Sequence, residues 1–449
     1  MRLIATCHLF SKEGFYMMNL IIRRLMIVYK AEIIQFLLNH PDSQEKAWEY
    51  QALRPFLGSS LLVTTMEKAR KRRKIIYPAF HTRIFNDYME VFNEKSMKLI
   101  KELKKQPDQW IDLERCIKQV TLRIICATAM GVQLEANEEA KQFFECVEQG
   151  KDLSFRKILQ PWMNNNFVHK MFSSERKLKK IKAEALRFIE KVISESKNHF
   201  HIEADRNLSE AESSSNDESA SWNRKSFIHL LLEAHSQDPE DFTLTDVRDE
   251  VLTFIIEGMD TVSSMASMVL MMLGLDQTVQ EKTRQEVNSI FHDDPLRLMT
   301  YDDLKDMKYL DCVIKETLRL YPTTALIAKE IGKDMLIGDY QIPGGTGLVI
   351  NLYMLHRDPN HFPNPELFDP DRFLPENSIR RHPFAYMPFS AGARNCIGQR
   401  FAKAEMKCLV ANILRRFQIQ TRDHRDKLKL SWEITTVLVD PVFAKFIPC

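Results

Sequence analysis

One cysteine-containing stretch near the C-terminus constrains the fold more than any other part of the sequence. Cys396 lies between Gly392 and Gly398, two residues after Arg394 and seven after Phe389. A thiolate that faces a metal ion needs a tight, glycine-rich turn, in which backbone N–H groups point toward the sulfur. A single cysteine in a protein core is more often a small buried hydrophobe. The complete pattern favours a metal-binding cysteine at the start of a helix.

Composition indicates a mostly helical protein with a large core. Hydrophobic residues make up 44% of the chain, and glycine occurs only 13 times against 21 methionines, so long apolar segments have few breakers. The net charge of +2 excludes a strongly basic nucleic-acid binder and a disordered acidic chain. The eight cysteines show no zinc-type spacing, which indicates reduced thiols in a protein that faces the cytosol.

The sequence divides into an unassigned start and one large domain. Residues 1–28 contain no transmembrane span, because Arg23 and Arg24 interrupt their best apolar region. Residues 29–449 form the predicted domain. Within it, residues 201–223 are polar, acidic and rich in serine, and we predict a flexible surface loop there.

A long helix is predicted from Thr245 to about Leu275, with an N-cap and acidic residues in its first turn. Glu257, Asp260 and Thr261 lie in its otherwise apolar middle. One interpretation is a solvent-facing stripe on an amphipathic helix. The other is a functional face, because buried carboxylates are costly unless they are paired or used. Glu257 and Thr261 are four residues apart and so share a face.

A basic segment precedes the first long helices. Residues 67–81 hold the strongest charge run of the chain, in a protein that is otherwise nearly neutral. Such a run is often a solvated helix face or a localisation signal. As a single local patch, it also suits an anionic partner, either the carboxylates of a cofactor or an acidic protein surface.

The order of further motifs places the cysteine stretch in context. Glu316 and Arg319 are followed by Tyr-Pro, by strand-like segments, by a Pro- and Asp-rich segment containing Arg372, and then by Cys396. An isolated Glu-x-x-Arg is usually a surface ion pair. In this order the motifs resemble the cytochrome P450 family, whose fold is mostly α with small β-sheets and holds haem between the long central helix and the Cys loop. The resemblance implies that Cys396 is the proximal iron ligand, and that Glu316, Arg319 and Arg372 form a buried triad that stabilises the core.

The resemblance also implies roles on the long helix. The run from Glu257 to Thr261 is similar to the oxygen-activation motif of P450 family 4, the fatty-acid ω-hydroxylase branch. Gly258 would leave a groove for dioxygen, and Asp260 and Thr261 would be the catalytic residues, with Asp260 relaying protons. Glu257 stands where this branch commonly forms an ester with a haem methyl group, and both outcomes, ester and free haem, stay open.

The expected cofactor is haem b, whose anionic propionates need cations. By resemblance these are Arg73, Arg394 and Lys329, although Lys329 stands where arginine is more usual and Ala69 replaces a tryptophan. Phe389 and Gly392 complete the expected cofactor-binding residues, which are together Cys396, Arg394, Arg73, Lys329, Phe389, Gly392, Gly258 and Glu257.

The resemblance implies a haem-thiolate monooxygenase that inserts one oxygen atom from O2 into an apolar, fatty-acid-like substrate. Electrons would come from NADPH through cytochrome P450 reductase, with cytochrome b5 as a second expected partner and no nucleic acid. The expected location is the cytosolic face of the endoplasmic reticulum membrane, with peripheral membrane contact. The family's anchor and early strands are missing at the start, so the chain is expected to be N-terminally truncated. The alternatives are a reductase-independent isomerase or dehydratase and a non-catalytic haem-binding protein.

Overall fold

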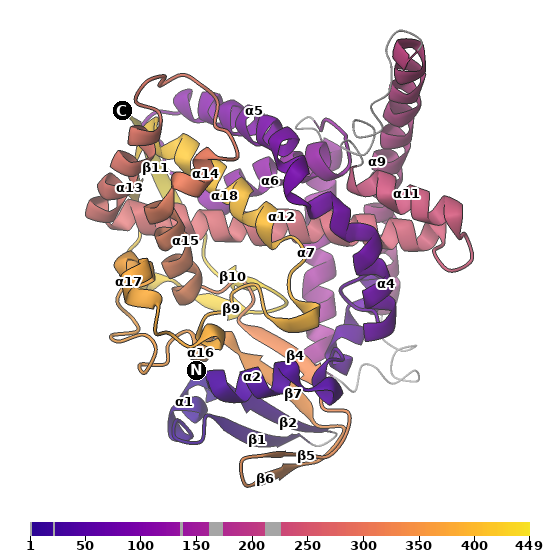
Figure 1. Ribbon diagram of the computed structural model, residues 1–449, viewed down its shortest axis with the longest axis vertical. Helices are drawn as coiled ribbons and strands as arrows, with labels where there is room; N and C mark the ends of the chain where they lie inside the picture. Colours follow the sequence, from indigo (N-terminus) through magenta and orange to yellow (C-terminus); the bar gives the residue numbers. More distant parts are fainter. Residues whose placement is uncertain (1, 21–22, 135–137, 161–173, 212–225) are drawn as a thin grey trace.

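The computed structural model describes residues 2–20, 23–134, 138–160, 174–211 and 226–449. Most of them lie in helices that surround one central helix, α12 (Figure 1). The helices are α1 (Arg2–Leu9), α2 (Ala31–Asn39), α3 (Arg54–Leu57), α4 (Met66–Ile76), α5 (Phe85–Lys104), α6 (Leu113–Ala129), α7 (Glu138–Leu159), α9 (Ser174–Ala211), α11 (Phe227–Gln237), α12 (Leu244–Leu275), α13 (Gln277–Ile290), α14 (Asp303–Asp306), α15 (Lys308–Leu320), α16 (Leu352–Leu355), α17 (Pro375–Ser378) and α18 (Gln399–Leu414).

In the described part of the chain the strands form four small sheets, in agreement with the predicted mostly α fold. One sheet has the order β1 (Phe15–Leu20), β2 (Arg23–Val28), β7 (Gly347–Asn351), β4 (Leu326–Glu330). A second has the order β3 (Ile111–Asp112), β11 (Phe443–Pro448), β8 (Phe417–Thr421). The hairpins are β5 (Met335–Ile337) with β6 (Tyr340–Ile342), and β9 (Leu430–Trp432) with β10 (Thr436–Leu438).

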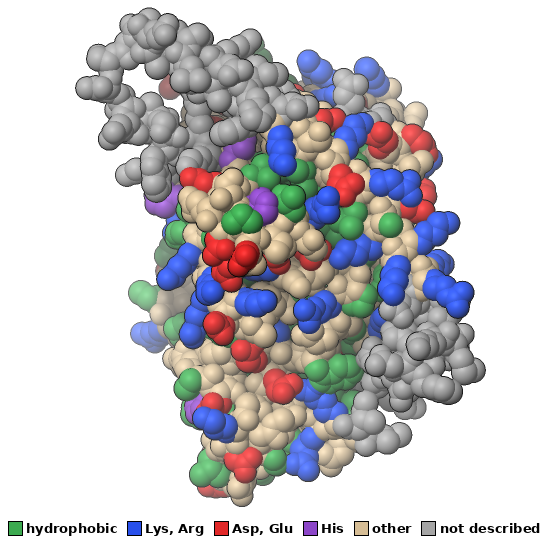
Figure 2. Space-filling model, turned by 90° about the vertical axis from the view of Figure 1, so that its right-hand side faces the viewer, with side chains coloured by type: hydrophobic (Ala, Val, Ile, Leu, Met, Phe, Trp, Pro, Cys, Tyr) green, Lys and Arg blue, Asp and Glu red, His purple; other side chains and the backbone are tan. Residues whose placement is uncertain are grey.

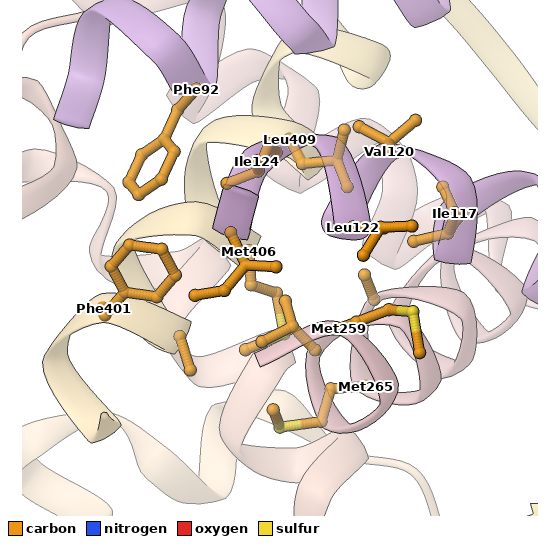
Figure 3. Close-up of a cluster of buried hydrophobic side chains, with 14 of the residues drawn as sticks. Phe92, Ile117, Val120, Leu122, Ile124, Met259, Met265, Phe401, Met406 and Leu409 are labelled. Carbon is orange, nitrogen blue, oxygen red and sulfur yellow. The ribbon is translucent and has the colours of Figure 1, made fainter. Parts of the chain in front are cut away.

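The predicted long helix is confirmed as α12. Thr243 caps its N-terminus in a capping box with Asp246, which satisfies backbone N–H groups of the first turn. By length and hydropathy α12 could cross a membrane, but 72% of its most apolar window is buried inside the protein, as expected of a core helix. Figure 3 shows apolar side chains of α5, α6, α12 and α18 meeting in this core, among them Phe92, Ile124, Met259 and Phe401.

The start of the chain differs from the sequence prediction. We expected residues 1–28 to lack the early strands, but Phe15–Leu20 and Arg23–Val28 form the antiparallel pair β1–β2, and β2 runs parallel to β7. Met26 and Val28 are fully buried in this sheet, and Arg23 pairs with Glu330 at 2.8 Å. The short apolar runs around Arg23 are therefore strands, whose six-residue length is typical of a sheet.

The predicted loop at 201–223 is also partly wrong. Helix α9 continues through residues 201–211, because glutamate, alanine and leucine in this segment are good helix formers despite its polarity. The rest of the predicted loop lies outside the described residues.

The predicted triad is confirmed. Glu316 and Arg319 are fully buried, with Nε of Arg319 donating to Oε2 of Glu316 at 2.7 Å. Nε of Arg372 donates to Oε1 of the same carboxylate at 3.0 Å. Arg319 and Arg372 also donate to backbone carbonyls of residues 356, 363 and 367. The triad therefore ties α15 to the irregular segment that leads to the cysteine stretch.

We expect Glu316→Ala to destabilise the protein by about 3–5 kcal/mol, because two buried arginines lose their counter-charge. The free energy of unfolding from urea titration would measure this. Glu281→Ala is the matched control, since Glu281 forms the same i, i+3 pair with Arg284 but its side chain is half exposed; it should cost about 0.2–1 kcal/mol. Equal losses in the two variants would contradict a core role for the triad.

Candidate active site between the long helix and the cysteine loop

A cavity of about 280 Å³ lies between α12 and the loop that carries Cys396. Its polar lining includes Glu257 and Thr261 of α12, Arg73 of α4 and Lys329 of β4. Its apolar lining consists of Leu61, Leu62, Phe80, Ile125, Phe254, Val262, Met265, Ile327, Phe389, Ile397, Phe401 and Ile434. The cavity therefore combines a cysteine and a charged rim with apolar walls.

The cysteine loop is held by its own backbone. Ser390 and Gly392 have positive φ values of 61° and 74°, and the N–H of Cys396 donates to the carbonyl of Phe389 at 2.9 Å. Gly392 supplies the turn, since this backbone conformation costs glycine little. The loop ends where α18 begins, and the Cys396 side chain is exposed because it faces the cavity.

The thiol of Cys396 is buried from bulk water although it faces the cavity. Burial raises its pKa to about 11, while a hydrogen bond from the Gly398 backbone and the charge of Arg73 act in the opposite direction. The thiol is therefore protonated at neutral pH in the absence of a cation. A bound metal ion would displace this proton and take the thiolate as its ligand.

Four cations meet at the rim of the cavity: Arg73, Arg394, Lys329 and Lys46. Arg73 donates to the carbonyl and side-chain oxygens of Asn395 at 2.8 and 2.7 Å. Arg394 donates to the carbonyls of residues 61 and 64 at 3.2 and 3.1 Å. Within the described part of the chain, none of the four forms an ion pair with a carboxylate. The rim therefore offers unneutralised positive charge.

Lys46 is a rim residue that the sequence analysis missed. It forms an isolated β-bridge with Lys329, and its ammonium lies 4.0 Å from the ring centroid of Tyr50. Burial lowers its pKa to about 7, with Arg394 adding to the effect, and burial likewise lowers the pKa of Lys329 to about 8. No local pattern marks Lys46, because only the pairing of distant segments brings it to the cavity.

Three of the α12 residues predicted to belong to the site lie at the cavity. Glu257, Gly258 and Thr261 all line the cavity, and the Thr261 hydroxyl donates to the Glu257 carbonyl at 2.7 Å. The missing side chain of Gly258 accommodates Ile125 of α6, since a Cβ there would lie 2.8 Å from the Ile125 Cδ1 atom. Gly258 thus lets α6 approach α12 at the cavity wall.

Asp260 lies apart from the other predicted site residues. It is 5% exposed and is not among the residues that line the cavity. Its carboxylate contacts Lys118 of α6 at 2.9 Å and Lys151 of α7 at 2.7 Å, and accepts a hydrogen bond from Thr435 at 3.1 Å. Burial alone would raise the pKa of Asp260, but the two lysines lower it to about 2.

These residues suit the expected haem. The unneutralised rim cations are the groups that two propionates would neutralise, the apolar walls suit a porphyrin ring, and the Cys396 side chain opens into the same space. All predicted cofactor-binding residues except Gly392 line the cavity, and Gly392 shapes the loop that holds Cys396.

Comparisons with known proteins agree with this geometry. The cytochrome P450 family model matches residues 5–446. Cytochrome P450 4V2 of Rattus norvegicus is 38% identical over 91% of this chain and 78% of its own length, and cytochrome P450 4c3 of Drosophila melanogaster is 37% identical over 94% and 80%. The crystal structure of the cytochrome P450DA haem domain covers 98% of this chain and 91% of its own, with a TM-score of 0.80 at 23% identity. The chain therefore belongs to the cytochrome P450 family, with family 4 members among its relatives, and is a haem-dependent monooxygenase.

Proposed function

We propose that this monooxygenase hydroxylates fatty-acid-like substrates with electrons that a reductase takes from NADPH. The observation that carries the proposal is the single cavity that joins Cys396, the α12 face and an apolar wall. An apolar chain gains about 0.8 kcal/mol for each methylene buried against such a wall. The similarity to family 4 members supports the same substrate class.

Each site residue has a role in this proposal. Cys396 binds the iron, and Arg73, Arg394, Lys329 and Lys46 bind the propionates. The haem, when bound, supplies the activation of dioxygen. Thr261 lies on the same face of α12 as Glu257 and holds its hydroxyl at the cavity. Phe254 and Met265 help to exclude water from the reacting groups.

The electron donor binds, in this proposal, to the outer face of α4. Lys68, Arg70, Lys71 and Lys74 are exposed there, although Lys71 pairs with Asp241 at 3.4 Å. Arg72, which the sequence grouped with this patch, is buried against Asp246 and Glu250 and is not available. Figure 2 faces the side on which α4 lies in Figure 1, and basic and acidic side chains are interspersed over that side as a whole. Within α4 itself, Glu67 is the single acidic residue among the basic ones. The complex acts at the cytosolic face of the endoplasmic reticulum membrane.

Turnover with a panel of fatty acids, NADPH and reductase tests the function. We expect hydroxylated products, and a reduced carbon-monoxide complex with the thiolate-haem absorbance. Cys396→Ala should abolish both, because among the described residues Cys396 is the one cysteine that lines the cavity. Cys449→Ala, at an exposed cysteine, is the control and should change neither. Products from sterols but not from fatty acids would refute the substrate class.

Lys46→Met should weaken haem binding by about 10- to 100-fold, because a hydrogen bond to a charged group contributes roughly 1.5–3 kcal/mol. The rate of haem transfer to an excess of apomyoglobin would measure the loss. Lys68→Met, which removes an exposed lysine of α4, should leave the rate unchanged. An unchanged rate for Lys46→Met would exclude Lys46 from propionate binding.

The α4 patch predicts salt-dependent electron transfer. Replacing Lys68 and Lys74 with glutamine should lower the association rate with reductase by about tenfold or more at low salt, with the difference shrinking as salt screens the charges. Stopped-flow reduction of the haem would report the rate. Replacement of the exposed Lys305 and Lys308 is the control. A salt-independent rate in the unmodified protein would argue against docking at α4.

A further inference from the structure

A groove of about 720 Å³ lies between α6, the first half of α7 and the segment that contains β10. It shares no lining residue with the cavity that contains Cys396. Residues 434–439 contribute to both, since Ile434 and Thr435 line the cysteine cavity and Val437 to Val439 line the groove. A volume in this range suits a small organic molecule. The groove is therefore a candidate for a second ligand site.

Much of the groove lining is apolar. The apolar residues come from α6, α7, the segment before α7 and the segment around β10, and are Leu122, Leu134, Ala140, Phe144, Val437, Leu438, Val439 and Pro441. The Val439 side chain is 56% exposed, and Phe144 and Leu438 are partly exposed. A ligand with an apolar body would remove this surface from water, which favours binding.

The charged part of the lining has an excess of carboxylates. The five carboxylates are Asp112, Glu114, Glu138, Glu145 and Glu148, and the four cations are Arg115, Lys118, Arg123 and Lys141. Two of the cations also pair with carboxylates outside the lining, Lys118 with Asp260 at 2.9 Å and Arg123 with Glu102 at 3.7 Å. The charge that the groove offers to a ligand is therefore negative.

The excess of carboxylates is largest around Lys118. Its ammonium lies 2.6 Å from Glu148, 2.9 Å from Asp260 and 3.8 Å from Glu114. Lys151 is the second cation of this cluster, at 2.7 Å from Asp260 and 3.8 Å from Glu148. Three carboxylates thus share two ammonium groups. Burial raises the pKa of Glu114, Lys118 opposes this, and the charges of Asp260 and Glu148 add to the rise. A further cation beside Glu114 would stabilise its ionised form.

Glu145 adds an unpaired charge one turn earlier on α7. Its side chain is exposed and forms no hydrogen bond or ion pair within the described part of the chain. The Arg115 side chain is also exposed and unpaired there, but it has Asp112 nearby, whose Oδ1 accepts the Arg115 backbone N–H at 3.2 Å. Glu145 has no such neighbouring cation, so its charge is available to a ligand.

We propose that this groove binds a lipophilic organic cation, an ammonium group attached to an apolar body. The ammonium group binds among Glu114, Glu145 and Glu148, and the apolar body covers Phe144 and Leu438. A metal ion is not the expected occupant, because no group of three His, Cys, Asp or Glu side chains among the described residues could hold one. The site goes beyond the proposed function and does not depend on it.

Octyltrimethylammonium is the probe, because a quaternary ammonium is charged at every pH and has no lone pair for an iron ion. Isothermal titration calorimetry on the full haem-loaded chain measures its affinity below the micelle concentration, with haem absorbance recorded on the same samples. We expect one probe per chain and unchanged absorbance. Tetramethylammonium should bind at least about 10²-fold more weakly, since each buried methylene contributes roughly fourfold in affinity. Octyl sulfate, with the same chain and the opposite charge, is titrated in parallel.

Two variants at exposed positions separate the charge from the apolar contact. Glu145→Lys should weaken probe binding by about 5- to 20-fold at low salt, and by less as salt screens the charges. Val439→Ser should weaken it by about fourfold, through lost apolar contact. Glu90→Lys is the matched control, because Glu90 is an exposed carboxylate of α5 that does not line the groove. It should leave the affinity unchanged. Thermal unfolding checks that all three variants fold.

Four results would overturn the proposal. The first is equal weakening by Glu145→Lys and Glu90→Lys, and the second is a probe affinity no tighter than that of tetramethylammonium. The third is a change in haem absorbance, or competition with an added fatty acid, because either would place the probe in the cysteine cavity. The fourth is octyl sulfate binding that Val439→Ser weakens, which would assign an anion to the groove. Probe binding as expected in a chain without a thiolate-haem spectrum would refute the proposed function and support this site.

Discussion

Unneutralised positive charge at the rim of one cavity is the interaction on which the site depends. Arg73, Arg394, Lys329 and Lys46 converge there without a carboxylate partner in the described chain, and burial depresses the pKa of each. Placing several cationic side chains close together in a partly desolvated site is unfavourable unless an anion binds there. Binding of a dianionic cofactor therefore relieves a cost that the folded chain carries, and ligand binding stabilises the fold by linkage.

The rest of the molecule keeps these rim cations and the cysteine loop at the same cavity. Apolar packing of α12 against α6 and α18 fixes one wall (Figure 3), and the Glu316 triad fixes the irregular segment before the cysteine loop. Lys329 reaches the rim from β4, whose sheet extends through β7 to β2 near the chain start. Residues far apart in the sequence thus hold the two sides of the cavity.

Patterns with a fixed local geometry were predictable from the sequence. The cysteine turn, the long helix α12 and the Glu316–Arg319 pair each depend on residues close together in the chain, and all three are confirmed. The N-cap of α12 is Thr243, two residues before the predicted Thr245. The strands within residues 15–28 were missed because a six-residue strand gives a weak signal until its partner, β7, is known. Lys46 was missed for the same reason, since a bridge to Lys329 is what places it. The helical stretch at 201–211 was misjudged because polarity was given more weight than helix propensity.

The two carboxyl groups of α12 show a limit of prediction from sequence motifs. Glu257 and Asp260 both carry a carboxyl group and are three positions apart. The sequence motif gives the proton-relay role to Asp260 by resemblance alone. Their pKa values differ because Lys118 of α6 and Lys151 of α7 form ion pairs with Asp260 and not with Glu257. The ionised carboxylate of Asp260 raises the pKa of Glu257, and it does so more than Lys151 lowers it. The two carboxyl groups therefore have pKa values shifted in opposite directions, although they lie one turn apart on the same helix.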